Sequence, residues 1–316
     1  MKRKHTILLT AIAVALVGAA GCSSTPNTGT QGSAAITQPD VPGTVFTIVF
    51  ENDDGINVMQ AANPTFMKLA AQYGEAKAYV SSTHPSLPNY IQMTSGATQG
   101  ANNDSDPPAN VQVPGTENLA DQLDAKGVPW RAYMESMGEP CKMTSSGDYS
   151  AHHDPFLYYS TMANDPARCA EHVVDYDKNF ATDLASGKYR YMWITPNMCN
   201  DLHNCSSQVA DAWLDKTTQL IMASDAYKNG GAIFVLFDEG SQRLLGAAAD
   251  LATIVISPNL AQPGVPSYTS FDHRSYLASV EDIFDLGRLP LTTGVTSMDE
   301  FFKLVSTPDG GEAGVP

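Results

Sequence analysis

The sequence predicts an α/β fold with a central, mostly parallel sheet and helices on both of its faces. Two observations support this prediction. Short apolar runs typical of strands buried on both faces recur along the chain, and segments with helical periodicity lie between them. Strands that alternate with helices form parallel sheets, and such sheets place their chemistry at the carboxyl ends of the strands.

The strand candidates are rich in β-branched and aromatic residues. The first of them, VFTIVF at 45–50, is followed directly by Glu51 and Asn52. Similar runs predict strands at 189–195, 232–237 and 252–257, with weaker candidates at 76–80 and 129–133. Helical patterns lie between them at 59–73, 86–95, 118–126, 208–227 and 274–286.

The composition excludes several classes of protein. The chain has 316 residues, with 18 Lys and Arg against 34 Asp and Glu, which gives a formal net charge of −16. An electrostatic nucleic-acid binder is excluded, because a phosphate backbone is held by clustered cations. Hydrophobic residues make up 43% and charged residues 16%, which is enough apolar material for a folded core. A solenoid is set aside, because the sequence has no internal repeat at a period of about 20 to 50 residues.

The first 21 residues are typical of an export signal. Residues 1–21 begin with basic residues, continue with an apolar run at 7–17 that is too short to cross a bilayer, and end in small residues directly before Cys22. Small residues before a lone cysteine resemble the bacterial lipobox. We therefore expect an exported protein, lipidated at Cys22 on the outer face of the cell membrane. The alternative is ordinary cleavage and secretion.

The flanks of the predicted domain differ from it in composition. Residues 22–42 are rich in Ser, Thr, Pro, Gly and Gln and predict a flexible tether, and residues 307–316 predict a disordered tail. The catalytic domain is therefore expected at 43–306. Removal of the signal leaves 15 basic and 34 acidic residues, a charge of −19 that gives no attraction to an anionic bilayer. We expect a monomer that reaches the membrane only through its lipid anchor.

Four cysteines lie inside the predicted domain: Cys141, Cys169, Cys199 and Cys205. An even count in an exported protein favours two disulfides over a metal site. Three pairings are possible. We favour Cys199 with Cys205, which closes a short loop, and this choice leaves Cys141 with Cys169.

Polar pairs follow three of the strongest strands: Glu51-Asn52, Pro196-Asn197 and Asp238-Glu239. Because the carboxyl ends of parallel strands meet at one edge of the sheet, we expect these residues to converge. Carboxylates at such positions are costly to desolvate unless they are paired or bind a cation. The sequence therefore predicts a divalent-metal site, with the alternative that each acid caps the loop or helix after it.

Ser86 begins the segment SLPNY, in which Pro88 suits the first turn of a helix. At that position its oxygen would face backbone N–H groups and the positive end of the helix dipole. Both features stabilise an anion, either an alkoxide or a bound phosphate. On this segment alone, a capping role for Ser86 is the simpler interpretation.

Six short motifs follow one another along the domain and are typical of a single family. They are Glu51-Asn52, HPSLPNY at 84–90, HDPF at 153–156, TPNMCNDLH at 195–203, FDEG at 237–240, and DHRSYL at 272–277 followed by VEDIF at 280–284. Together they resemble the phosphoesterase family of bacterial acid phosphatases and phospholipase C-type enzymes, relatives of the alkaline phosphatase superfamily. The resemblance covers most of the domain and implies an alkaline phosphatase-like fold.

The resemblance also implies roles for particular residues. One divalent metal ion would be held by Glu51, Asn52, Ser86, Asp238 and Glu239. Ser86 would be the nucleophile, and His153 and His203 would stabilise the transferring oxygens and protonate the leaving alcohol. Substrate binding would fall to Asn89, Asp201 and His273. Oxygen ligands suit Mg²⁺, Ca²⁺ or Mn²⁺, and Zn²⁺ is a further candidate.

These assignments predict a metal-dependent phosphoric monoester hydrolase, similar to acid phosphatases, that forms a phosphoserine intermediate. Its substrate would be a phosphorylated small molecule or a lipid headgroup. Histidinium is most populated below its ordinary pKa of ~6.5, so we expect an acid optimum. The alternatives are a phospholipase C-type phosphodiesterase and a catalytically silent surface lipoprotein that binds phosphorylated ligands.

Overall fold

The computed structural model describes residues 43–81, 83–241 and 250–302. The predicted signal peptide at 1–21, the lipidation site Cys22, the tether at 22–42 and the tail at 307–316 lie outside the described residues and stay predictions. So do the last residues of the predicted domain, from 303 on. None of the described helices is both long and apolar enough to span a bilayer.

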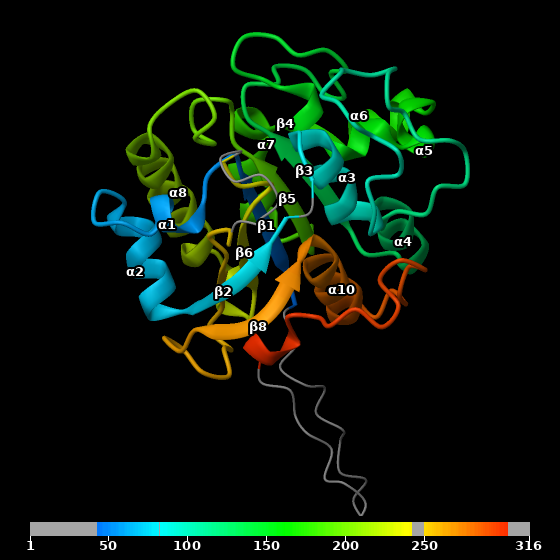
Figure 1. The fold of residues 1–316 in the computed structure, drawn as a ribbon. Coiled ribbons are helices and arrows are strands. Elements are labelled where there is room, and N and C mark those ends of the chain that lie inside the picture. Colours follow the sequence, from blue (N-terminus) through cyan, green and yellow to red (C-terminus); the bar gives the residue numbers. More distant parts are fainter. Residues whose placement is uncertain (1–42, 82, 242–249, 303–316) are drawn as a thin grey trace, which may run out of the picture. The chain divides into compact units, whose positions relative to one another are not determined.

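Eight strands of the described chain form one sheet, which is shown in Figure 1. They are β1 (Val45–Phe50), β2 (Gly74–Val80), β3 (Trp130–Met134), β4 (Val173–Asp175), β5 (Tyr191–Thr195), β6 (Ala232–Phe237), β7 (Ile254–Ile256) and β8 (Ser267–Asp272). Their order across the sheet is β4-β3-β5-β1-β6-β7-β2-β8. Only β7 is antiparallel to its neighbours, β6 and β2, so the predicted mostly parallel sheet is confirmed.

The helices cover both faces of this sheet. They are α1 (Gly55–Val58), α2 (Pro64–Gln72), α3 (Ser86–Ser95), α4 (Leu119–Lys126), α5 (Ser160–Ala163), α6 (Pro166–His172), α7 (Tyr176–Ser186), α8 (Ser207–Ala223), α9 (Asp225–Lys228) and α10 (His273–Phe284), with 3₁₀ turns η1 (Ala151–His153), η2 (Pro155–Tyr158) and η3 (Asp299–Phe301). Figure 1 shows α2 and α8 together on one face and α3, α4 and α10 on the other. The predicted two-sided arrangement is confirmed.

Two central strands set the position of the candidate site. β1 and β6 are buried at every residue and pair in parallel along their whole length. The N–H of Asp238 continues this pairing by donating to the carbonyl of Phe50 at 3.0 Å. Both strands therefore end together, and the acids that follow them start from the same edge of the sheet.

Two predicted helices differ from the observed ones for local reasons. The helix expected at 59–73 begins only at Pro64, because the residue before a proline disfavours helical geometry and proline suits the first helical position. The helix expected at 208–227 is broken at Ser224, which has an extended backbone and caps α9 by accepting from the N–H of Tyr227. The helices predicted at 86–95, 118–126 and 274–286 correspond to α3, α4 and α10.

Both favoured disulfides are present, Cys141 with Cys169 and Cys199 with Cys205. The second closes a loop directly after β5. That loop carries Asp201 and His203, so a covalent link borders two of the candidate site residues.

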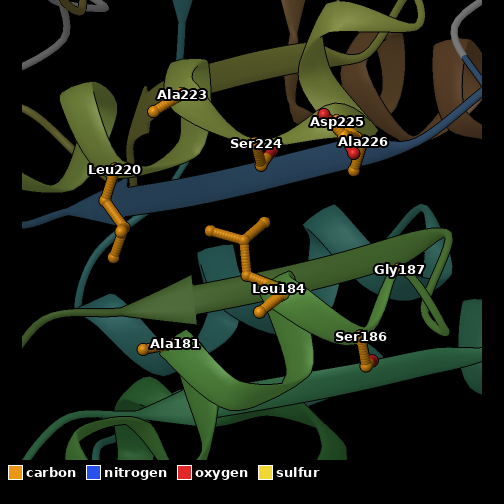
Figure 2. Close-up of a pocket in the computed structure, with 10 residues that line it drawn as sticks. Ala181, Leu184, Ser186, Gly187, Leu220, Ala223, Ser224, Asp225 and Ala226 are labelled. Carbon is orange, nitrogen blue, oxygen red and sulfur yellow. The ribbon is translucent and has the colours of Figure 1, made fainter.

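A groove of about 430 Å³ lies between the ends of α7 and α8 (Figure 2). Leu184 of α7 and Leu220 of α8 point into it, and small residues such as Ala181 and Ala223 form most of the rest. Because α7 and α8 begin at the carboxyl ends of β4 and β5, their last turns lie at the opposite edge of the sheet. The groove is therefore remote from the strand-end acids.

Candidate active site

The first residue of α3 meets the end of β1. Ser86 is buried, with 3% of its surface exposed, and its Oγ lies 2.9 Å from Glu51 Oε2 and 3.3 Å from Asn52 Oδ1. Its one proton can be donated to either oxygen. The residue before the helix, Pro85, offers no side-chain cap. Three of the residues predicted at one centre, namely Ser86, Glu51 and Asn52, are thus brought together.

Tyr90, a later residue of the same helix, supports the contact between Ser86 and Glu51. Tyr90, one helical turn after Ser86, donates to the other carboxylate oxygen of Glu51, Oε1, at 2.5 Å. Its ring stacks on His153, with centroids 5.3 Å apart and planes 9° from parallel. Tyr90 was not predicted as a site residue. Its spacing of four from Ser86 is the signal that could have placed it on the same helix face.

Glu51, Asp238 and Asp201 form a buried group of acids at this edge, each with essentially no exposed surface. Burial raises the pKa of Glu51 well above its usual range, and the charges of Asp238 and Asp201 raise it further. Burial also raises the pKa of Asp201 to about 7 and that of Asp238 well above its usual range. Both oxygens of Asp238 and Oδ2 of Asp201 lack a hydrogen-bond partner.

His153 lies between two of these acids. Its Nε2 is 3.2 Å from Glu51 Oε1, and its Nδ1 is 3.4 Å from Asp201 Oδ2. Although Nε2 is close to Glu51, the two atoms do not form a hydrogen bond, so this buried nitrogen has no hydrogen-bond partner in the described chain. Burial lowers the pKa of His153 well below its usual value, and nearby His203 lowers it further. His153 is therefore a neutral imidazole with one nitrogen available inside the site.

Glu239 turns toward a different set of partners. Its Oε2 is 2.8 Å from His84 Nδ1 and accepts from Asn89 Nδ2 at 3.0 Å. Asn89 Nδ2 also lies within hydrogen-bond distance of the carbonyls of Thr83 and Pro85. These bonds tie the turn before Ser86 to β6. The amide hydrogens of Asn89, predicted to bind substrate, are used inside the protein.

His273, also predicted to bind substrate, is fully buried at the start of α10. Its Nε2 is 2.6 Å from the carbonyl of Asp238 and its Nδ1 is 3.0 Å from the hydroxyl of Tyr79. Both ring nitrogens are thus engaged before any substrate arrives. We interpret His273 as a residue that positions Asp238 through its main chain.

His203 is exposed on the disulfide-closed loop. Its N–H donates to Asp201 Oδ1 at 2.8 Å, and its Nδ1 is 3.0 Å from Asn204 Oδ1. Its ring centroid is 5.9 Å from that of His153. The described chain offers no partner for Nε2 of His203, so this nitrogen is free to meet a ligand that enters from solvent.

One predicted convergence is wrong. Asn197, which follows β5, does not join the acids after β1 and β6. Its N–H donates to Glu135 Oε2 at 2.9 Å and its side chain to Ser136 at 3.0 Å. The cause is a competing carboxylate: Glu135 ends the neighbouring strand β3 and is buried there.

The acids Asp53 and Asp54, which follow the Glu51-Asn52 pair, are also accounted for. Asp54 accepts from the N–H and the hydroxyl of Ser241, at 3.0 and 2.6 Å. Asp53 accepts from the side chain of Asn57 at 2.7 Å. Asp54 therefore joins the loop after β1 to the loop after β6 instead of adding a free charge at Ser86.

The chemistry of this group fits a cation. No Lys or Arg of the described chain forms a salt bridge with Glu51, Asp201, Asp238 or Glu239; histidines are their only such partners. Buried acids without a compensating charge are unfavourable, and their unpartnered oxygens are the ligands that hard divalent ions prefer. Glu51, His153 and Asp201 each offer a ligand atom within 4.8 Å of the others.

Sequence comparison identifies a family and several relatives that are named as phosphatases. The phosphoesterase family profile matches residues 57–287. A probable acid phosphatase from Kluyveromyces lactis is 29% identical over 257 residues, 77% of this chain and 58% of that protein. A phosphatidylinositol-3-phosphatase from Mycobacterium tuberculosis is 24% identical over 260 residues, 82% of each chain. The chain thus spans a little over half the length of the Kluyveromyces relative.

Structure comparison confirms the fold. A 2-O GAG sulfatase superposes with a TM-score of 0.59 at 9% identity, covering 82% of this chain and 74% of its own. A protein in the alkaline phosphatase superfamily from Vibrio parahaemolyticus gives 0.57 at 11% identity, covering 81% and 70%. At such identities the likeness concerns the fold alone. The sequence match, which extends over most of the folded region, places this chain in the phosphoesterase family.

Proposed function

We propose that this chain is a metal-dependent phosphoric monoester hydrolase of the acid-phosphatase type, with Ser86 as its nucleophile. One observation carries the proposal. A buried serine at a helix start lies against Glu51 and close enough to Asp238 to influence the pKa of that acid, in a group of acids that lacks a cationic partner. A capping role alone would not require uncompensated acids around the hydroxyl.

One divalent ion, Mg²⁺, Ca²⁺, Mn²⁺ or Zn²⁺, would be held by oxygens of Glu51, Asn52, Ser86 and Asp238. Glu239, which the family resemblance adds to this set, lies near Asp238 and contacts His84 and Asn89. When bound, such an ion supplies positive charge that attracts the phosphoryl oxygens and favours the ionised form of the serine. The unpartnered oxygens of Asp238 support this assignment.

The residues of the chain would divide the reaction between them. Ser86 Oγ forms a bond to phosphorus while the bond to the alcohol oxygen breaks, which gives a phosphoserine; water then releases phosphate. The hydrogen bonds from Ser86 to Glu51 or Asn52 fix the hydroxyl before attack. The helix start contributes favourable dipoles at the developing charge.

The two histidines would have different tasks. His153 is buried and neutral, so it has one N–H. With that proton on its unpartnered Nε2 it would donate to a phosphoryl oxygen, and Nδ1 would accept from Asp201, which is protonated at acid pH because burial raises its pKa to about 7. His203 is exposed and keeps Nε2 free, so it is the better donor of a proton to the leaving alcohol. Asp201 orients both, through Oδ2 toward His153 and through Oδ1 on the N–H of His203.

The names of the relatives support phosphate esters as the substrate class. Several are named acid phosphatases, and the relative that this chain covers most fully is named for a phosphoinositide. We therefore propose soluble phosphate esters or lipid headgroups as substrates. Two disulfides support an exported protein, because such bonds persist in oxidising compartments. Lipidation at Cys22 and a monomeric state belong to the same proposal.

Replacing Ser86 by alanine tests the nucleophile. We expect Ser86→Ala to lower the turnover of p-nitrophenyl phosphate at least about a thousandfold, with the circular dichroism spectrum and melting temperature preserved. The matched control is Ser95→Ala on the same helix, because Ser95 is equally buried but donates only to backbone carbonyls. Its turnover should stay within about threefold of the wild type.

Acid quenching of the wild type should trap a phosphoryl group on the peptide that contains Ser86, detectable by mass spectrometry. If Ser86→Ala keeps most of its activity, the serine loses its assigned role. Dialysis against a chelator should abolish turnover, and Mn²⁺ or Mg²⁺ should restore it. Full activity in the chelated protein would contradict metal dependence.

A further inference from the structure

An acidic residue from a distant loop occupies the start of the helix that carries Ser86. Asp104 lies 17 residues after Leu87, and its Oδ1 accepts from the N–H of Leu87 at 3.0 Å. This is the main-chain amide directly after the proposed nucleophile. Asp104 belongs to none of the sequence motifs and has no part in the mechanism above.

The loop around Asp104 is held on both sides. Asp106 accepts from the N–H and the hydroxyl of Ser145, each at 2.7 Å. The carbonyl of Ser105 accepts from the hydroxyl of Tyr158 at 3.0 Å. Asp104 therefore has a fixed position at the head of α3, supported by contacts with two other segments.

The charge of Asp104 influences the pKa values of several groups around the site. The pKa of Glu239 is raised to about 6 by burial, and the charge of Asp104 adds to this rise. The pKa of His152 is lowered to about 4, chiefly by burial, and Asp104 opposes that change. Burial and the charges of three acids, Asp104 among them, raise the pKa of Tyr158. Asp104 thus faces groups on three elements: the loop after β6, η1 and η2.

We propose that Asp104 selects phosphoryl groups that carry a single negative charge over those that carry two. This inference rests on the proposed function, because it concerns a phosphoryl group bound at Ser86. A fixed carboxylate beside the nucleophile repels a dianion more strongly than a monoanion. For a separation of about 6 Å between the two charges, Coulomb's law with an effective dielectric constant of ~20 to 40 gives about a tenfold or larger discrimination.

The proposal gives the acid preference a second cause. The second pKa of a phosphate monoester is about 6, so monoesters lose one negative charge at acid pH. A site that repels dianions therefore binds monoesters better at acid pH, without the titration of any protein group. Phosphodiesters carry one charge at every ordinary pH and would show no such dependence from the substrate.

The opposing interpretation is that Asp104 only caps α3. Pro85 provides no side-chain cap, so the first N–H groups of the helix need an acceptor from elsewhere. Two variants separate the functions. Asp104→Asn keeps an oxygen for the N–H of Leu87 but removes the charge, whereas Asp104→Ala removes both.

The experiment compares two substrates with the same leaving group, p-nitrophenyl phosphate and methyl p-nitrophenyl phosphate, in the metal-loaded protein at pH 8. The first is then a dianion and the second a monoanion. We expect Asp104→Asn to raise the ratio of kcat/KM for the monoester to that for the diester about tenfold. At pH 4.5, where both substrates are monoanions, the ratio should match the wild type. High salt should weaken the effect at pH 8.

Asp165→Asn is the matched control, because Asp165 caps α6 by accepting from the N–H of Arg168 on the exposed surface. Its ratio should equal that of the wild type. An unchanged or lower ratio in Asp104→Asn, with the fold intact, overturns charge selection and leaves capping. The proposed function fails separately, if the metal-loaded wild type turns over neither substrate.

Discussion

Glu51 and Glu135 are both buried acids at the carboxyl ends of parallel strands, β1 and β3, which pair with β5 from its two sides, yet their surroundings differ. Glu135 accepts hydrogen bonds from the N–H of Asn197, the side chain of Asn200 and the indole of Trp213, at 2.9 to 3.0 Å. Its oxygens are fully used by neutral donors. Around Glu51, the neighbouring acids Asp201 and Asp238 keep oxygens that accept no hydrogen bond within the described chain.

The difference separates a structural acid from a candidate ligand. Neutral donors stabilise the charge of Glu135, and that charge holds the turn before Asp201 in place. The acids near Glu51 raise one another's pKa values and gain little from the surrounding protein. Burial and position at a strand end are common to both groups. The supply of donors distinguishes them, and this criterion can be tested.

The largest effect is expected at Asp238. In the chelated protein, Asp238→Asn should raise the melting temperature, because it removes a buried carboxyl group whose ionisation is opposed by burial and by nearby acids. In the metal-loaded protein the order should reverse, because the variant binds Mn²⁺ at least ~100-fold more weakly and loses about 2.7 kcal/mol of ligand stabilisation. Thermal unfolding with and without chelator checks this, and an unchanged order would contradict a metal at Asp238.

Glu135→Gln should have an intermediate effect, and it should destabilise the protein whether or not metal is bound. Glutamine has one acceptor oxygen, so either the N–H of Asn197 or the indole of Trp213 loses its partner, at a cost of about 1 to 3 kcal/mol. Urea unfolding should show the same loss of free energy in chelated and metal-loaded protein. A loss confined to one of these states would mean that the two acid groups are not independent.

The smallest effect is expected at Asp154. In its hydrogen bonding this acid is intermediate between Glu135, whose oxygens both have partners, and Asp238, whose oxygens have none in the described chain. It is fully buried, one oxygen accepts from the N–H of Phe156 at 3.1 Å and the other has no partner. Burial raises its pKa to about 8. The unfolded value is ~3.9, so the stability associated with the neutral acid is present below pH ~3.9 and is lost as the pH rises through 8.

Asp154→Asn should therefore be nearly neutral at pH 4 and stabilise the protein by roughly 1 to 2 kcal/mol at pH 9. Chemical unfolding at the two pH values measures the difference. Because no charged group is among the causes of the Asp154 shift, the result should not depend on added metal. A variant that is less stable than the wild type at pH 9 would show that the carboxylate has a favourable partner.

The sequence was most informative where burial is complete. β1, β6 and α3 have the predicted bounds, because continuous apolar runs and a serine followed by a Pro-containing turn are local signals. The strands β4 and β8 and the helices α6 and α7 were not predicted. β4 is buried but has only three residues, which is too short for a recognisable apolar run. β8 is an edge strand in which Tyr268 is 76% exposed, so it lacks the pattern of a buried strand.

The candidate site divides in the same way. Glu51 and Asn52 could be placed at the site because the carboxyl ends of parallel strands converge. Ser86 could be joined to them only through the resemblance to the phosphoesterase family, and its contacts with both agree with that assignment. Asn197 pairs with Glu135, and Glu239 pairs with His84. The topology brings these groups to the same edge of the sheet but does not determine which of them pair. Asp104 could not be predicted, since its contact with Leu87 depends on the course of a long loop.

The Cys199–Cys205 bond has a practical consequence for making this protein. The loop it closes carries Asp201 and His203, while β1 and α3, which bring Ser86 to Glu51, contain no cysteine. Expression in a reducing cytosol would therefore leave the loop of Asp201 and His203 without its covalent closure, and Cys141 and Cys169 unpaired. Production through an oxidising export route is the suitable choice for enzymology, and a thiol count on the purified sample should precede any rate measurement.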